Sequence, residues 1–175
     1  VDPREHRAEQ QAAHEARRAA AKRQDVTFGE AWDVYVEARK SFWSQRHCND
    51  HIKNASIGGE PRKRGKGLTE SGPLASLRPL KLPEMTGERI GQWMADEAAY
   101  RPTMAALSYR QLRAFIRWAF EYKDYSGLMP SDAYKARDVK DAVPRVKAKE
   151  GDVLQREQRP AWFAAALHDP RHRRP

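Results

Sequence analysis

The sequence predicts an all-α protein in which one small helical domain carries a long basic loop. Apolar residues recur at the three- and four-residue spacing of a helix on both sides of that loop. Threonine or serine precedes several of these segments, as helix N-caps do. Glycine and proline concentrate between residues 54 and 83 and break any long element there. The 175 residues are enough for one ordinary domain with extensions, so part of the chain is expected outside the core.

Residues 1–25 are predicted to form a linker helix before the domain. Asp2 and Pro3 provide a cap and a first-turn signal. Alanine is then interspersed with arginine, glutamate and glutamine, which favours a helix but gives it no large apolar side chain to bury. A basic helix can also lie along phosphates, but the glutamates in this segment weaken that alternative.

The domain is predicted to begin at Val26 with two helices. Thr27 and Glu30 are spaced as a capping box, and the apolar residues that follow keep helical spacing to about Lys40. A second helix is expected from near Ser44 to near Ile52. The side chains expected on its exposed side are Arg46, His47, Asp50, His51 and Lys53.

Residues 54–83 are predicted to be one long loop, with room for a short hairpin or a turn of helix around Leu74 to Leu77. Basic residues outnumber acidic ones there, and the stretch RKRGK at 62–66 concentrates the charge. Loops of this length are usually functional or mobile.

Two further helices are predicted after the loop. Thr86 is the expected N-cap of the first, and the second and longest is expected over 103–122. Their core sides are expected to be Ile90, Trp93, Met94 and Ala98 in the first and, in the second, Ala105, Tyr109, Leu112, Ile116 and Ala119, widened by Phe115, Trp118 and Tyr122.

The rest of the chain is predicted to hold smaller elements. After a break at Gly127, a short helix is expected to carry Lys135, Arg137 and Lys140. Residues 144–152 have the composition of a hinge, and 154–167 form one more amphipathic segment. The predicted divisions of the chain are a linker helix at 1–25, the helical domain at 26–143 and a C-terminal part at 144–175.

The charge of the chain points to a polyanionic partner. The formal net charge is +9 and the pI about 9.8, a balance that favours nucleic acid first. A membrane surface is the second candidate, but the sequence has no long apolar run, signal peptide or lipidation motif. A soluble basic protein without such a partner is the remaining alternative. The single cysteine, Cys48, cannot form an intramolecular disulfide, which favours a reducing, cytoplasmic setting.

The longest helix has a basic flank opposite its core side. Arg110, Arg113 and Arg117 lie at positions i, i+3 and i+7, with Thr103 near the start of the helix and Leu107 on the same side. Arginine can reach phosphates or the O6 and N7 atoms of guanine in a major groove, and a threonine near a helix start can bind phosphate. A solvated surface is the alternative, but only one acidic residue lies between 101 and 123.

The sequence offers little for other chemistry. His47, Cys48 and His51 can approach one metal ion, but no second cluster of ligands occurs elsewhere. The sequence contains no P-loop, no GxSxG or HExxH motif and no acidic cluster of the two-metal type. We therefore expect neither a metal nor a cofactor.

Four stretches, in this order along the chain, resemble a known family. They are TFGEAWDVYVEARKSFWSQRH (27–47), GGEPRKRGKG (58–67), RPTMAALSYRQLRAFIRWAFEY (101–122) and LQREQRPAWFAA (154–165). Together they cover roughly residues 27–167. The family is that of the tyrosine recombinases of the phage integrase type, in a proteobacterial prophage branch.

The resemblance implies a small SAM-like bundle of four or five helices, the core-binding domain, which forms half of a clamp around double-stranded DNA. Two helices of that domain face the major groove, and they correspond here to 44–53 and 103–122. The long loop is an embellishment of this branch, and a role for it on DNA is our own hypothesis. The full-length parent would meet other integrase protomers on DNA, whereas this fragment is expected to be monomeric without DNA.

The resemblance also implies where the chemistry of the family lies. A tyrosine attacks the scissile phosphate to form a 3′-phosphotyrosyl link, and Arg, Lys and His side chains stabilise the developing charge. That second domain is expected to start near Leu154, but its first catalytic motif, of the Gly-x-Arg-x-x-Glu type, has no counterpart before Pro175. The tyrosines at positions 100, 109, 122, 125 and 134 precede the catalytic region. None is expected to be the nucleophile, and we expect no strand cleavage by this chain.

The sequence thus predicts duplex DNA binding at attachment sites, in DNA integration and site-specific recombination, without strand-cleavage residues. One alternative is a protein-interaction module in which the apolar segment 154–167 docks on a partner. Another is a helix-turn-helix regulator, which would need a short turn where this chain has an insertion and another helix. The candidate DNA-binding residues are Ser44, Arg46, His47, His51, Lys53, Arg62, Lys63, Arg64, Lys66, Thr103, Leu107, Arg110, Arg113, Arg117, Lys135, Arg137 and Lys140.

Overall fold

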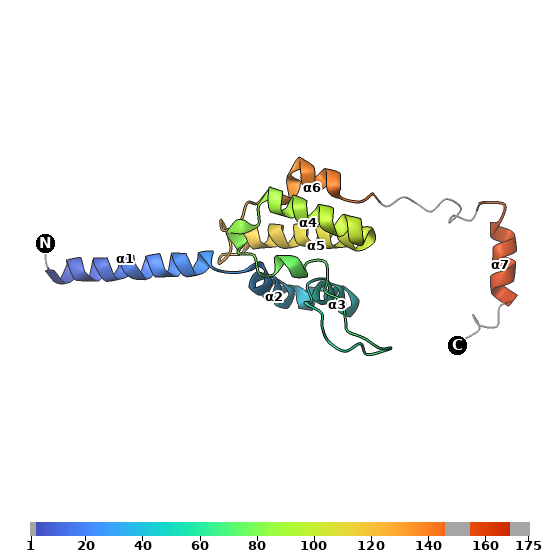
Figure 1. Cartoon of the computed structure of the whole chain (residues 1–175), viewed down its shortest axis with the longest axis horizontal. Helices are drawn as coiled ribbons and strands as arrows, with labels where there is room; N and C mark the ends of the chain where they lie inside the picture. The colour runs from blue at the N-terminus through green and yellow to red at the C-terminus, as the bar shows by residue number, and fades with distance from the viewer. Residues whose placement is uncertain (1–2, 146–154, 169–175) are drawn as a thin grey trace. The chain divides into compact units, whose positions relative to one another are not determined.

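The computed structural model describes residues 3–145 and 155–168, which are helices joined by turns and loops (Figure 1). The described residues contain two isolated β-bridges and no β-strand, so the prediction of an all-α protein is confirmed. The elements are α1 (Pro3–Gln24), α2 (Phe28–Arg39), η1 (Lys40–Phe42), α3 (Gln45–Asn54), η2 (Ala75–Leu77), η3 (Leu82–Glu84), α4 (Gly87–Tyr100), α5 (Pro102–Glu121), η4 (Ala133–Lys135), α6 (Arg137–Ala142) and α7 (Arg159–His168), where η marks a single 3-10 turn.

The chain forms two compact units, residues 1–144 and residues 145–175. The second unit contains α7, which overlaps the predicted amphipathic segment at 154–167 and extends one residue beyond it. Its Trp162 and Phe163 rings meet edge to face at 5.1 Å, and both side chains are about half exposed. The predicted hinge at 144–152 and the polar tail after 168 fall mostly outside the described residues.

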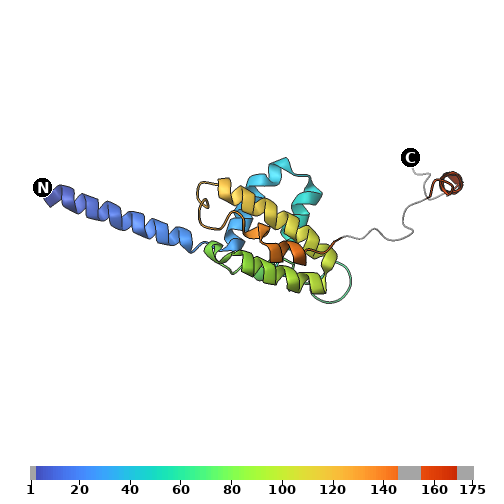
Figure 2. The same ribbon diagram turned by 90° about the horizontal axis from the view of Figure 1, so that it is seen from above.

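The first unit is built around α5. Both views show α4 on one side of α5 and α2 with α3 on the other, and α6 packs against α4 (Figure 1, Figure 2). The predicted core side of α5 is confirmed, because spacing by three and four residues places its apolar side chains on one side of the helix. The buried residues on that side are Ala105, Tyr109, Leu112, Phe115, Ile116 and Ala119.

An aromatic cluster joins α2 to α5 at the centre of this unit. The Phe115 ring lies 5.1 Å from that of Phe28, 5.5 Å from that of Trp32 and 5.6 Å from that of Tyr35. Rings at such separations, tilted or edge to face, contribute beyond the area that they bury. This cluster fixes α2 on α5 and thereby sets the position of α3, which follows α2 in the chain.

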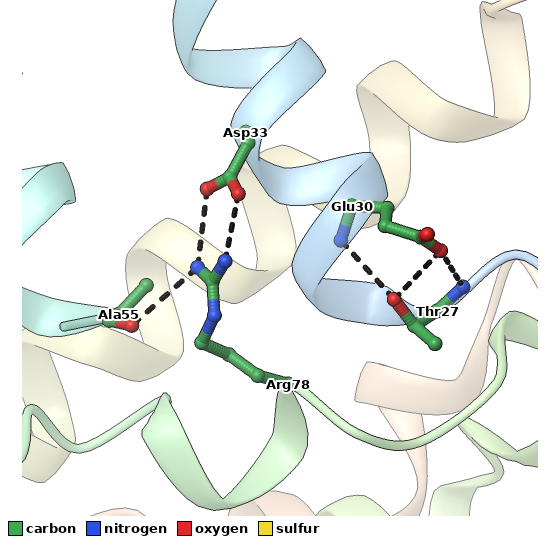
Figure 3. A network of polar contacts seen from close by, with 5 residues as sticks. All are labelled: Thr27, Glu30, Asp33, Ala55 and Arg78. Carbon is green, nitrogen blue, oxygen red and sulfur yellow. Dashed lines mark hydrogen bonds and ion pairs between the residues drawn. The ribbon is translucent and has the colours of Figure 1, made fainter. Parts of the chain in front are cut away.

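The start of α2 has the predicted capping box, which is confirmed. The Thr27 hydroxyl accepts a hydrogen bond from the Glu30 backbone N–H at 3.2 Å, and the Glu30 carboxylate accepts from the Thr27 N–H at 2.9 Å (Figure 3). The Thr27 hydroxyl also donates to this carboxylate at 2.9 Å, and the hydrogen bonds from the Thr27 N–H and hydroxyl lower the pKa of Glu30. The reciprocal contacts satisfy N–H groups that have no partner inside a helix.

The predicted long loop at 54–83 divides into two parts of different kinds. Residues 57–70, hereafter the arm, form an exposed hairpin in which Pro61 bridges Leu68. Residues 71–82, hereafter the core segment, bury the side chains of Leu74, Leu77 and Leu82. The predicted long loop is confirmed, with the turn of helix expected around Leu74 to Leu77 present as η2, but the burial of the core segment was not predicted.

The core segment supplies partners to the start of α2. The backbone N–H of Phe28 donates to the carbonyl oxygen of Leu80 at 2.7 Å, and that of Gly29 donates to the carbonyl oxygen of Arg78 at 3.0 Å. The Arg78 guanidinium bonds both carboxylate oxygens of Asp33, at 3.1 and 2.7 Å, and reaches the carbonyl oxygen of Ala55 at 3.5 Å (Figure 3). The core segment thus ties the first turns of α2 to the end of α3.

Candidate nucleic-acid interface

A buried polar contact fastens α3 to α5. The Asn54 side-chain amide donates to the side-chain oxygen of Gln111 at 2.8 Å, and both residues are at most 5% exposed. Buried polar groups are costly unless paired, so this contact holds the two helices in one relative position. The sequence analysis missed both residues. The available signal was a glutamine next to the core residue Leu112, within an otherwise apolar side of α5.

His51 is part of the core, so the prediction that it is exposed is wrong. Its side chain is 1% exposed, and its ring stacks on those of Trp43, at 4.2 Å, and Trp32, at 5.7 Å. The Nδ1 atom lies 2.9 Å from the carbonyl oxygen of His47, which accepts the hydrogen of the Nδ1–H tautomer. Burial lowers the pKa of His51, which favours the neutral ring.

The buried side of α3 explains this correction. Its three buried residues are Cys48, His51 and Asn54, which recur at every third position and so lie on one side of the helix. His51 thus packs α3 against the rings of Trp32 and Trp43. In a sequence, polar residues at this spacing are only a weak indication of a buried side, because partners distant in the chain decide whether that side is buried.

The outer side of α3 keeps the other predicted residues. Arg46, His47 and Lys53 are exposed. Ser44 is the N-cap of the helix, and its hydroxyl oxygen accepts a hydrogen bond from the backbone N–H of His47 at 3.3 Å. The N-terminal end of α3 is therefore exposed, capped and basic.

The basic flank of α5 is exposed as predicted. The side chains of Arg110, Arg113 and Arg117 are exposed, Thr103 is exposed in the first turn, and Leu107 is half-buried. Arg110 Nε donates to the carbonyl oxygen of Ala106 at 3.3 Å. No carboxylate among the described residues forms an ion pair with any of the three arginines. Three unpaired positive charges thus face solvent along one helix.

The arm carries basic side chains of two kinds. Arg62 is used within the arm, where Nε donates to the carbonyl oxygen of Leu68 at 2.9 Å and Nη2 lies 3.3 Å from a Glu70 carboxylate oxygen. Lys63, Arg64 and Lys66 are exposed and have no ion-pair partner in the described part of the chain. Only these last three have charges free for a ligand.

The residues predicted near α6 are less closely associated with α5. Lys135 follows Tyr134, whose carbonyl oxygen accepts a hydrogen bond from the Tyr109 hydroxyl at 2.8 Å, so it lies beside α5. Arg137 is paired with Asp141 at 3.5 Å on α6. Lys140 is also on α6, which packs against α4 rather than α3. Lys135 thus lies in η4, which contacts both α4 and α5, whereas Arg137 and Lys140 are on α6.

The described ranges contain neither a cluster of metal ligands nor a candidate membrane-spanning helix. Within 3–145 and 155–168, no three His, Cys, Asp or Glu side chains gather closely enough to hold a metal ion. In the same ranges, no helix combines the length and the apolar composition needed to cross a membrane.

Comparison with known proteins identifies the family. A family model described as the phage integrase core-binding domain matches residues 27–141, from the N-cap of α2 into α6. The chain is 40% identical over 180 residues to "Prophage integrase IntF" of Escherichia coli (strain K12), an alignment that covers 97% of this chain and 39% of that protein. The chain therefore spans less than half the length of this relative, and no solved structure matches it. Because the match includes α2 to α5 and the arm, the chain belongs to the phage integrase family of tyrosine recombinases, through its core-binding domain.

Proposed function

We propose that this chain binds double-stranded DNA at recombination sites, with the exposed sides of α3 and α5 toward the major groove. The observation that carries the proposal is the row of exposed arginines at 110, 113 and 117, none of which has an ion-pair partner among the described residues, together with the exposed Arg46 and His47 on α3. The buried contact between Asn54 and Gln111 holds the two helices together as one surface. Membership of an integrase family and the net charge of +9 support the same partner.

The dimensions and chemistry of these helices suit such a partner. A major groove about 12 Å wide admits one α-helix, and arginine is the side chain that most often pairs with guanine there. Contacts with phosphates fix the orientation of a protein on DNA, whereas contacts with base edges select the sequence. Arg46, Arg110, Arg113 and Arg117 can serve in either role, and Ser44, His47, Lys53, Thr103, Leu107 and Lys135 complete the proposed contact surface.

The proposal assigns different roles to the parts of the chain. Residues 26–143 form the DNA-binding domain, 1–25 form a linker helix, and 144–175 begin the catalytic domain of a longer recombinase. Other integrase protomers on the same DNA would be its partners in the parent protein, within the cytoplasm. The proposed role is DNA binding without strand cleavage. In this role, the residues described here bind and position the DNA.

Charge reversal on α5 tests the proposal. Arg110→Glu, Arg113→Glu and Arg117→Glu are combined in one variant, and Arg18→Glu, Arg89→Glu and Lys123→Glu form a matched control at exposed positions outside the proposed surface. Fluorescence anisotropy with an attachment-site duplex is measured between about 50 and 200 mM salt. The α5 variant should bind at least about tenfold more weakly than the control, with a smaller salt slope. Equal binding by the two variants would show that α5 does not face the groove.

The same titration separates the proposal from a protein-interaction role. The half-exposed rings of Trp162 and Phe163 on α7 are the feature that favours that alternative. In a titration with random duplex DNA, a module of that kind would not show the steep salt dependence that phosphate neutralisation produces.

A further inference from the structure

The arm and α3 enclose a groove of about 750 Å³. Its α3 wall consists of Asn49, Ile52 and Lys53, and the arm provides residues 60–64 together with Thr69 and Glu70. We propose that this groove, hereafter the arm groove, binds the sugar–phosphate backbone of duplex DNA independently of base sequence. The inference rests on the proposed function, to which it adds a second contact surface besides the faces of α3 and α5.

The lining of the arm groove suits phosphates. Three cations of the lining, Lys53, Lys63 and Arg64, have no ion-pair partner among the described residues. Of its two carboxylates, Glu70 is engaged by Arg62 and Glu60 has no ion-pair partner there, so the unpaired charges of the lining are positive in balance. The hydroxyl of Thr69 and the amide of Asn49 are of the kinds that contact DNA phosphates and sugars.

No aromatic side chain lines the arm groove, so it offers no platform on which bases of a single strand could stack. Lysine acts toward phosphate as a mobile point charge and does not impose the fixed geometry that reading a base edge requires. The lining therefore favours the backbone of a duplex over unpaired bases.

The arm is held in place before any ligand binds. The backbone N–H of Gly59 donates to the carbonyl oxygen of Thr69 at 2.9 Å, and the N–H of Thr69 donates to that of Glu60 at 2.7 Å. At the root of the arm, the Gly72 N–H donates to the carbonyl oxygen of Ser56 at 2.7 Å. Because the arm does not have to be ordered on binding, its charges gain more of their interaction energy.

The arm groove lies at the C-terminal end of α3. This end would lie outside the major groove if the N-terminal end of the helix entered it. Ten residues of α-helix rise about 15 Å, and the major groove is about 12 Å wide. If Ser44 to His47 approach the bases, Lys53 and the arm lie one groove width away, where the phosphate strand borders the groove. The position of the arm thus favours the backbone over base edges.

Neutralising the arm tests the inference in the whole chain. Lys63→Gln and Arg64→Gln, at the two unpaired cations that the arm contributes to the groove, are combined, with Arg89→Gln and Lys123→Gln as the matched control for total charge. Both are titrated with an attachment-site duplex and with a scrambled duplex. The arm variant should lose affinity by the same factor on both duplexes, and its salt slope should fall by about two, one for each lost phosphate contact. Its melting temperature should equal that of the parent, because both side chains are exposed.

The outcomes are distinguishable. If the parent binds duplex DNA but the arm variant keeps the affinity and salt slope of the control, the inference is overturned while the proposed function stands. If the arm variant loses only its preference for the attachment-site duplex, the arm reads bases and the backbone assignment is wrong. If the parent binds neither duplex, the proposed function itself fails.

Discussion

The arm and the core segment are neighbours in the sequence, but the arm is exposed and the core segment is largely buried. Both contain glycine and proline, and neither contains an α-helix. Residues 61–70 of the arm are all exposed, whereas Leu74, Leu77 and Leu82 of the core segment are at most 3% exposed. The core segment also accepts hydrogen bonds from Phe28 and Gly29 at the start of α2. The difference shows that a stretch without helical periodicity can be core if its leucines and carbonyl groups have partners elsewhere in the chain.

The largest effect expected from this comparison is that of Leu74→Ala in the core segment. Removing a fully buried leucine leaves a cavity and should lower the free energy of unfolding by about 2–5 kcal/mol. The matched change in the arm is Leu68→Ala, at a side chain that is 59% exposed, and it should cost about 0.5 kcal/mol or less. Urea denaturation followed by tryptophan fluorescence measures both. Equal losses would mean that the two regions do not differ as described.

A substitution at the junction between the two regions should lower the free energy of unfolding nearly as much as Leu74→Ala. A Cβ at Gly72 would lie 2.2 Å from the carbonyl oxygen of Lys53 and 2.4 Å from that of Asn54, so Gly72→Ala must displace backbone and should cost about 2–3 kcal/mol. Gly65→Ala, at the arm tip, meets no atom within 4 Å and strains only a backbone φ of +82°, which costs about 1 kcal/mol. Denaturation midpoints compare the variants, and a larger loss for Gly65→Ala would contradict a close-packed junction.

Two arginines extend the comparison to ion pairs. Arg78 of the core segment is 23% exposed and bonds both oxygens of Asp33, whereas Arg62 of the arm is 47% exposed and reaches one oxygen of Glu70. Arg78→Ala should cost about 1 kcal/mol, because it removes two hydrogen bonds to Asp33 made by a largely buried guanidinium. Arg62→Ala should cost a few tenths of a kcal/mol, about what a surface pair contributes. Thermal melts of the two variants give the comparison, and an equal shift would refute it.

The sequence predicted the elements whose pattern is local. The apolar residues of α5 recur at helical spacing, and this periodicity predicted both the helix and its core side. The capping signal of Thr27 and Glu30 depends on four consecutive residues and predicted the start of α2. The exposure of Arg110, Arg113 and Arg117 follows from the same periodicity, since they lie opposite the core side. Their contact with DNA stays a prediction.

The sequence did not predict features that depend on residues far apart in the chain. Leu74 and Leu82 stand among glycines and prolines without periodicity, and they are buried in the same core cluster as residues of α2, α4 and α5. His51 has the polarity of a surface residue, and only the rings of Trp32 and Trp43 make it part of the core. The contact between Asn54 and Gln111 joins positions 57 residues apart, which no local pattern reveals.

The smallest effect expected is a pH dependence that arises in α3, the helix beside the arm. Unfolded His51 takes up a proton as the pH falls through about 6.5, whereas burial lowers its pKa in the folded chain. Unfolding therefore takes up a proton, and the stability contributed by neutral His51 is lost as the pH falls below about 6.5. His51→Gln should lessen the loss of melting temperature between neutral and mildly acidic pH, while the same change at His14, an exposed position of α1, should leave it unchanged. The prediction fails if the two variants behave alike.

The most direct test of the DNA-binding surface is a map of backbone amide shifts when duplex DNA is added to the isotope-labelled chain. The account predicts the largest shifts in the first half of α3, along the exposed side of α5 and at residues 62–66 of the arm. It predicts little change in the core segment, where Leu74 and Leu77 are buried. Shifts concentrated in α7 or α4, with α5 and the arm unchanged, would contradict the claim that α3, α5 and the arm form the surface that meets DNA.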